Sequence, residues 1–189
     1  MKFPEVLQRI TATLVKTQVA YMLTGSFASA YYGALRSTQD IDLVISATQQ
    51  QLRHFIESLP NDEYYADVEA ALEAHKKMSM FNVIDMRTGW KIDMIILKNR
   101  AFSREEFLRR QLVRTSEASF FVATAEDVIL AKLEWAKGAR SNRQIQDAAG
   151  IVKIRGEAVD FSYLKKWISE LNLEAEWNDV QRAAATGSI

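Results

Sequence analysis

The feature that most constrains the fold is a short apolar segment, Asp40–Ile45, that carries two acids. Its Ile, Leu and Val residues predict a β-strand. Because side chains alternate along a strand, Asp40 and Asp42 share one face and the apolar residues occupy the other. Two neighbouring carboxylates repel each other, and a divalent cation removes the repulsion. Mg²⁺ prefers one or two carboxylates together with water and phosphate oxygens, so this strand is predicted to hold a metal ion.

A glycine and a serine, Gly25 and Ser26, precede this strand, where an apolar run ends and an alanine-rich segment begins. This position predicts a strand-to-helix junction. Glycine lets a phosphate approach the backbone closely, and helix N-termini offer free N–H groups to anions. We therefore expect Gly25 and Ser26 to bind phosphate. Arg36, just before the acids, is either a further phosphate contact or an exposed loop charge.

A third acid, Asp93, interrupts an apolar strand. The segments 78–85 and 90–97 predict a hairpin, and an unpaired carboxylate among apolar residues is costly. Metal binding, a general-base role or a salt bridge to Lys91 would each explain Asp93. Asp85, at a strand end beside the turn, is a weaker candidate.

The remaining elements follow from apolar periodicity. Expected helices cover 4–17, 26–33, 48–59, 103–113, 124–137, 161–171 and 174–185, and further strands cover 18–24 and 118–122. Residues 62–75 are expected to begin as strand or loop and to continue as helix. A Ser103–Glu106 capping box supports the helix over 103–113. The predicted fold class is α/β: a small mixed sheet flanked by helices over residues 1–122, then a helical part over 123–189.

Lys132 lies on the packed face of its helix, four residues from both Val128 and Ala136. A lysine at the edge of a packed face needs a phosphate or a carboxylate partner. Asp147 follows in the next segment, where its pattern alone reads as an exposed helix acid.

The Gly-Ser pair, the spacer, the Asp-Ile-Asp strand and the later Asp93 resemble the nucleotidyltransferase superfamily of the polymerase-β type. The segment 25–44, GSFASAYYGALRSTQDIDLV, is most similar to the bacterial AbiEii toxin and related minimal nucleotidyltransferases. The resemblance spans residues 19–152. The segments EDVILAKLEW and RQIQDAAGI resemble further motifs of that group. The resemblance implies that Lys132 contacts nucleotide phosphate and that Asp147 is a catalytic or positioning acid.

The resemblance implies transfer of a nucleoside monophosphate from a nucleoside triphosphate to an acceptor, with the nucleotide in a cleft between the two parts. Two Mg²⁺ ions, with Mn²⁺ as an alternative, would be held by Asp40, Asp42 and Asp93. It also implies the toxin of a toxin–antitoxin or phage-defence pair, acting on RNA such as tRNA or on another target, with an antitoxin protein as partner. The alternatives are an antibiotic nucleotidyltransferase and a non-catalytic nucleotide-binding or interaction module.

Composition excludes several other classes. The 189 residues are 48% apolar, with 24 basic and 24 acidic side chains, so a globally basic nucleic-acid binder is not indicated. No cysteine is present, which rules out thiolate chemistry and disulfides. The first residues lack the apolar segment of a secretory signal, and no apolar run approaches the roughly 18 residues of a membrane span. We expect a cytoplasmic protein without membrane association.

Overall fold

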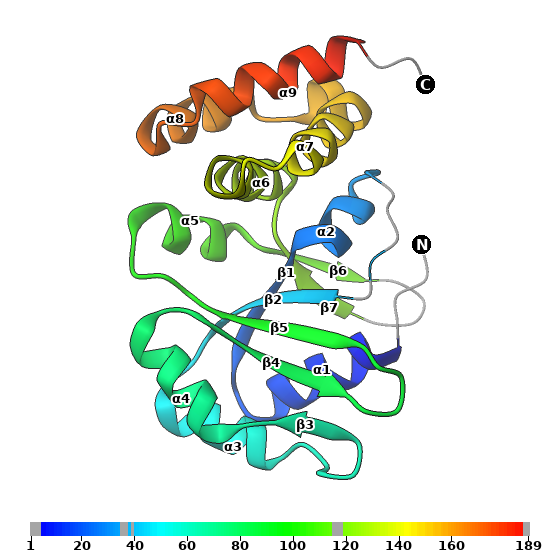
Figure 1. Ribbon diagram of the computed structural model, residues 1–189, viewed down its shortest axis with the longest axis vertical. Helices are drawn as coiled ribbons and strands as arrows, with labels where there is room; N and C mark the ends of the chain where they lie inside the picture. Colours follow the sequence, from blue (N-terminus) through cyan, green and yellow to red (C-terminus); the bar gives the residue numbers. More distant parts are fainter. Residues whose placement is uncertain (1–4, 35–37, 39, 115–118, 187–189) are drawn as a thin grey trace. The chain divides into compact units, whose positions relative to one another are not determined.

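The computed structural model describes residues 5–34, 38, 40–114 and 119–186 (Figure 1). The chain divides into two compact units, one formed by residues 1–26 and 37–123 and the other by residues 27–36 and 124–189. In the described residues, no helix has both the length and the apolar character needed to cross a membrane.

The first unit is built on a mixed sheet, as predicted. Within the described residues it has seven strands in the order β3-β4-β5-β2-β1-β7-β6. The strands are β1 (Ala20–Thr24), β2 (Asp40–Ser46), β3 (Tyr64–Ala66), β4 (Met80–Asp85), β5 (Lys91–Ile96), β6 (Gln111–Arg114) and β7 (Ser119–Val122). Strand β2 is central, since it pairs in parallel with β5 and antiparallel with β1. The strand that carries two of the predicted acids therefore has a neighbour on each side.

Four helices of the described residues belong to this unit: α1 (Glu5–Lys16), α3 (Gln49–Glu57), α4 (Val68–Lys77) and α5 (Ala101–Arg109). Helix α1 contacts β1 and buries an apolar stripe that includes Ile10 and Leu14. Helix α3 begins after a capping box in which the Thr48 hydroxyl and the Gln51 side chain each accept a backbone N–H of the other residue. Helices α3 and α4 pack side by side (Figure 1). The predicted helices over 4–17 and 48–59 are confirmed.

The prediction of one helix over 103–113 is wrong. Helix α5 starts two residues earlier, without a side-chain cap, and ends at Arg109. The Ser103 hydroxyl accepts a hydrogen bond from Arg100 Nε at 2.9 Å, so Ser103 lies inside the first turn and does not cap the helix. The residues that follow form β6, which pairs antiparallel with β7 and places Val113 opposite Phe120 in the core. Burial against a partner strand decides their conformation.

The second unit is helical, as predicted. Helix α2 (Gly25–Tyr31) directly follows β1 and enters this unit at Phe27. Its other elements are α6 (Ala125–Ala139), α7 (Asn142–Arg155), the 3₁₀ turn η1 (Gly156–Ala158), α8 (Phe161–Leu171) and α9 (Glu174–Thr186). The segment after α2 packs on α7, because a Cβ added at Gly33 would lie 2.6 Å from Ile154 Cδ1.

Two acids at the start of α6, Glu126 and Asp127, are buried. The Asp127 carboxylate is fully buried and accepts hydrogen bonds from the hydroxyls of Thr124, at 2.6 Å, and Tyr163, at 2.7 Å. Glu126 accepts the backbone N–H of Asp160 at 3.0 Å. Both acids therefore connect α6 to the start of α8.

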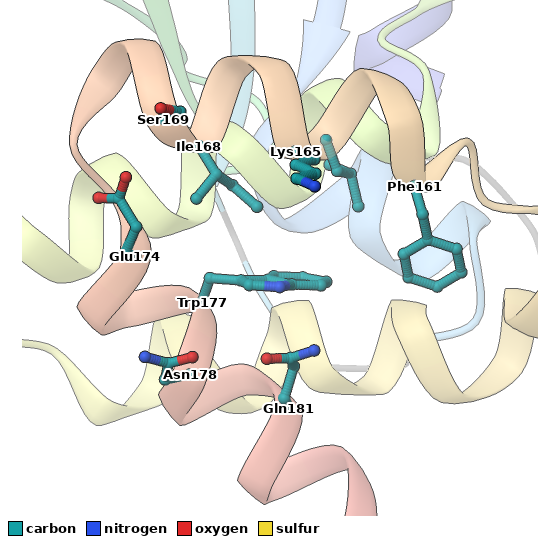
Figure 2. Close-up of a pocket in the computed structure, with 9 residues that line it drawn as sticks. Phe161, Lys165, Ile168, Ser169, Glu174, Trp177, Asn178 and Gln181 are labelled. Carbon is teal, nitrogen blue, oxygen red and sulfur yellow. The ribbon is translucent and has the colours of Figure 1, made fainter.

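A pocket of about 460 Å³ lies between α8 and α9 (Figure 2). Leu164 and Ile168 line the pocket from α8, and the half-buried indole of Trp177 lines it from α9. The remaining lining residues are Phe161, Lys165, Ser169, Glu174, Asn178 and Gln181. None of the predicted site residues lines this pocket.

Candidate active site

The two strands with acids place Asp42 and Asp93 beside each other. Strands β2 and β5 run parallel, with Asp42 in register with Asp93 and Asp40 in register with Lys91. Residues in register on neighbouring strands point to the same face, and neighbouring strands lie about 4.8 Å apart. The predicted sharing of faces is confirmed, and two carboxylates that are 51 residues apart in sequence form one acidic site.

Gly25 lies directly against this acidic pair. Strand β1 pairs with β2 on the side away from β5, and its last residue, Thr24, is in register with Asp42. Gly25 has a φ of +63°, and a Cβ added there would lie 1.9 Å from Asp42 Oδ2. Only glycine fits this position, because it tolerates the positive φ and leaves room for the carboxylate. The predicted strand-to-helix junction is confirmed, and phosphate binding at Gly25 and the buried Ser26 stays a prediction.

The Asp93 carboxylate already has two partners. Lys91 Nζ lies 2.9 Å from Oδ1 and 3.2 Å from Oδ2, and Asn82 Nδ2 donates to Oδ1 at 2.5 Å. The hydrogen bond to Asp93 raises the pKa of Lys91, and the negative charges of Asp93, Asp40 and Asp42 raise it further. Of the explanations left open by the sequence, the salt bridge to Lys91 is present. All three carboxylates act electrostatically on the same ammonium group.

Asn82 contacts the acidic site and was not predicted from the sequence. It is in register with Asp93 across the β4–β5 hairpin. Asn82 could have been identified from the sequence, because it is the single amide in an otherwise apolar stretch before Asp85. The predicted hairpin also places it near Asp93.

The acidic site fits a hard divalent cation that receives its other ligands from a bound substrate. Mg²⁺ takes one or two protein carboxylates and completes its shell with water and phosphate oxygens. Asp42 and Asp93 supply two such carboxylates, and the Lys91 ammonium marks a position where positive charge is stabilised. Among the described residues, no three His, Cys, Asp or Glu side chains form a complete metal centre by themselves. Joint coordination by Asp40, Asp42 and Asp93 stays a prediction.

Lys132 and Asp147 form a pair within the helical unit. Lys132 Nζ lies 2.8 Å from Asp147 Oδ2 and 2.9 Å from Gln144 Oε1, which links α6 to α7. The side chains are only 5% and 11% exposed, so the interpretation of Asp147 as an exposed acid is wrong. The prediction that Lys132 lies on a packed face is confirmed, and its contact with a nucleotide stays a prediction. Arg36 lies outside the described residues.

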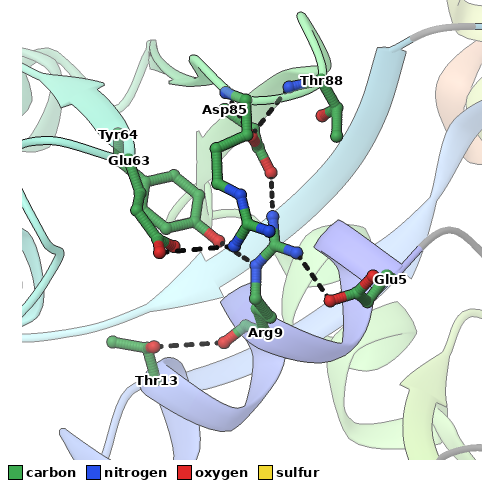
Figure 3. Close-up of polar contacts among 8 residues, drawn as sticks. Glu5, Arg9, Thr13, Glu63, Tyr64, Asp85 and Thr88 are labelled. Carbon is green, nitrogen blue, oxygen red and sulfur yellow. Dashed lines mark hydrogen bonds and ion pairs between the residues drawn. The ribbon is translucent and has the colours of Figure 1, made fainter.

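Asp85, the weaker candidate acid, has a different environment (Figure 3). It is fully buried, forms an ion pair with Arg9, and accepts the backbone N–H groups of Arg87 at 2.9 Å and Thr88 at 3.2 Å. Arg9 also donates to the Tyr64 hydroxyl at 3.0 Å, and this bond, together with the charge of Asp85, raises the pKa of Arg9. Asp85 therefore connects α1 to the β4–β5 turn and has a structural role.

We expect Asp85→Asn to destabilise the protein by about 2 kcal/mol, because a buried hydrogen bond between two charged groups loses its charge. Glu5→Gln is a matched control, since Glu5 pairs with the same arginine but is 76% exposed. It should cost well under about 1 kcal/mol. Urea unfolding of both variants measures the difference. Equal midpoints for the two variants would contradict the structural role of Asp85.

Comparison with known proteins supports the fold. No protein-family model matches the chain, and neither does any curated protein. Among solved structures, the chain is similar to the antibiotic-resistance factor ANT(2'')-Ia, with a TM-score of 0.54 and 12% identity over 92% of this chain and 95% of that one. An antigenic nucleotidyltransferase-like protein from Paracoccidioides brasiliensis gives a TM-score of 0.48 and 13% identity, over 92% of this chain and 91% of that one. At 12% identity, the likeness to ANT(2'')-Ia shows a shared fold and nothing more.

Proposed function

We propose that this protein is a divalent-metal-dependent nucleotidyltransferase that transfers a nucleoside monophosphate from a nucleoside triphosphate to an acceptor. The observation that carries the proposal is the in-register pairing of Asp42 with Asp93 on adjacent parallel strands, with Gly25 pressed against Asp42. Two carboxylates beside a close-packed glycine turn suit a metal-bound triphosphate. The resemblance of the sequence motifs to the nucleotidyltransferase superfamily agrees with this chemistry.

In the proposed reaction, Asp40, Asp42 and Asp93 hold the cations, Mg²⁺ or Mn²⁺. Cations held by these carboxylates would supply positive charge that neutralises the triphosphate. Gly25 and Ser26 bind the terminal phosphates through backbone N–H groups, with Arg36 as a further contact. The acceptor oxygen bonds to the α-phosphorus, the bond between that phosphorus and the α–β bridging oxygen breaks, and pyrophosphate leaves. Asp93 accepts the proton of the acceptor hydroxyl.

For the acceptor, we propose RNA, with tRNA as the first substrate to test, and a role as the toxin of a toxin–antitoxin or phage-defence pair. The support is the resemblance to the AbiEii group, which extends to Lys132 and Asp147 in the helical unit. In this proposal Lys132 contacts nucleotide phosphate, Asp147 positions it, and an antitoxin protein is the partner. A small antitoxin-like reading frame next to the gene would agree with this role.

A second candidate acceptor is a small cationic antibiotic. The observation that favours it is the similarity of fold to the antibiotic-resistance factor ANT(2'')-Ia. A non-catalytic binding module fits less well, because all three acids of the motif are present.

The deciding experiment incubates the protein with each of the four α-³²P-labelled nucleoside triphosphates and Mg²⁺, with total tRNA or a panel of cationic antibiotics as acceptor. We expect label from one nucleotide to enter tRNA, and we expect a chelator to stop the transfer. Label on an antibiotic alone would replace the first acceptor with the second. If neither acceptor is labelled with Mg²⁺ or Mn²⁺, the proposal of transfer to these acceptor classes is wrong.

A further inference from the structure

Lys91 lies at the edge of the acidic site. It is the first residue of β5, in register with Asp40 and two residues before Asp93 on the same face. Its ammonium contacts both carboxylate oxygens of Asp93, at 2.9 and 3.2 Å. The Lys91 side chain is 43% exposed, whereas that of Asp93 is 12% exposed. The exposed partner can leave the contact easily, and the buried carboxylate cannot follow it.

Several negative charges act on the Lys91 ammonium, namely those of Asp40, Asp42 and Asp93. Asn82, which donates a hydrogen bond to Asp93, is a neutral amide, whereas Lys91 brings a positive charge into contact with the Asp93 carboxylate. A divalent cation that binds Asp93 must approach the same oxygens that Lys91 contacts.

We propose that Lys91 is an internal counter-cation of the acidic site, which holds the Asp93 carboxylate in place without metal and competes with the divalent cation for its oxygens. The inference rests on the metal site of the proposed function. It makes Lys91 a positioning residue that acts through Asp93 and sets the metal affinity. A lysine that only stabilises the end of β5 would leave the metal affinity unchanged.

Competition between two cations predicts a specific direction. Binding of the divalent ion moves the Lys91 ammonium away from the Asp93 oxygens, so deletion of that charge should tighten metal binding. At a partly exposed site, a unit charge a few ångströms from a divalent ion contributes about 1–2 kcal/mol, which corresponds to about tenfold in affinity. Because mobile ions screen this repulsion, the effect should shrink as salt is raised.

The test measures Mn²⁺ binding to the full chain without nucleotide, from the free Mn²⁺ signal in electron paramagnetic resonance. We expect Lys91→Met to bind Mn²⁺ about tenfold more tightly than wild type at low salt, with a smaller gain at high salt. Lys91→Arg keeps the charge and should bind with an affinity close to that of wild type. Asn82→Ala removes only the neutral donor and should change the affinity much less than Lys91→Met does.

Lys77→Met is the matched control, because Lys77 forms a 3.0 Å ion pair with Glu73 that lies outside the acidic site. It should leave Mn²⁺ affinity unchanged. Lys91→Gln serves as a second neutral variant, and circular dichroism melts confirm that each variant is folded.

The outcomes separate the inference from the proposed function. Equal or weaker Mn²⁺ binding in folded Lys91→Met and Lys91→Gln, beside measurable binding in wild type, overturns the role of Lys91 and leaves the metal site intact. An absence of Mn²⁺ binding in wild type and in both neutral variants overturns the inference together with the metal site. Tighter Mn²⁺ binding in Lys91→Met and Lys91→Gln, together with an affinity close to that of wild type in Lys91→Arg, supports the competition.

Discussion

Replacing Asp42 with asparagine is expected to slow nucleotidyl transfer by about 10³-fold or more, because a metal contact supplies several kcal/mol of transition-state stabilisation. The substitution preserves the size of the side chain and removes its charge. The melting temperature should hardly fall, since Asp42 is only half-buried and losing its charge relieves repulsion with Asp93. Initial rates with labelled nucleotide and a thermal melt give both numbers on one preparation.

Asp62→Asn is the matched control for this prediction, because Asp62 is an exposed acid of the same unit and lies outside the acidic site. It should leave both the rate and the melting temperature at wild-type values. Wild-type activity in Asp42→Asn would remove Asp42 from the metal site. A rate loss accompanied by an equal loss of folded protein would assign Asp42 to the fold.

Replacing Lys132 with methionine is expected to have two large effects. It leaves the buried Asp147 carboxylate without its ammonium partner, and breaking a buried pair in this way costs about 3–5 kcal/mol. For a chain of this size that corresponds to a fall in melting temperature on the order of 10 °C. If Lys132 also contacts nucleotide phosphate, as proposed, the rate at a temperature where the variant is folded should fall about 10²–10³-fold.

A double variant, Lys132→Met with Asp147→Leu, separates the two effects of Lys132. Removing both charges eliminates the uncompensated buried carboxylate, so much of the melting temperature should return. A purely structural pair predicts that the rate returns as well. A phosphate contact predicts a stable protein that remains slow, and full recovery of the rate would exclude Lys132 from the site.

Part of the acidic site could be predicted from the sequence, because part of its geometry follows from local rules. Alternation along a strand assigns Asp40 and Asp42 to one face, and the β4–β5 hairpin follows from two apolar runs around a short turn. The parallel pairing of β2 with β5 has no local signal, since it depends on the strand order of the whole sheet. The family resemblance implied a third acid near the first two but did not predict which strands pair.

Other features escaped prediction because long-range contacts decide them. The segment that begins at Gln111 is held as a strand by β7, although its local pattern reads as the end of a helix. Asp127 lies in the first turn of its helix. The Tyr163 hydroxyl that donates a hydrogen bond to it is 36 residues away in sequence. The sequence indicated a phosphate or a carboxylate as the partner of Lys132. Packing of α6 on α7 places the Asp147 carboxylate beside it. In each case, residues distant in sequence determine the environment.

Joint binding of a divalent cation and a nucleotide by Asp42 and Asp93 is measured most directly by calorimetric titration of a non-hydrolysable nucleoside triphosphate, with Mg²⁺ and with chelator. The nucleotide would be the one selected in the transfer experiment, and the proteins compared would be wild type and the double variant Asp42→Asn/Asp93→Asn. We predict that Mg²⁺ strengthens nucleotide binding to wild type and has no effect on binding to the folded double variant. A double variant that keeps the wild-type, Mg²⁺-dependent affinity would contradict the metal site.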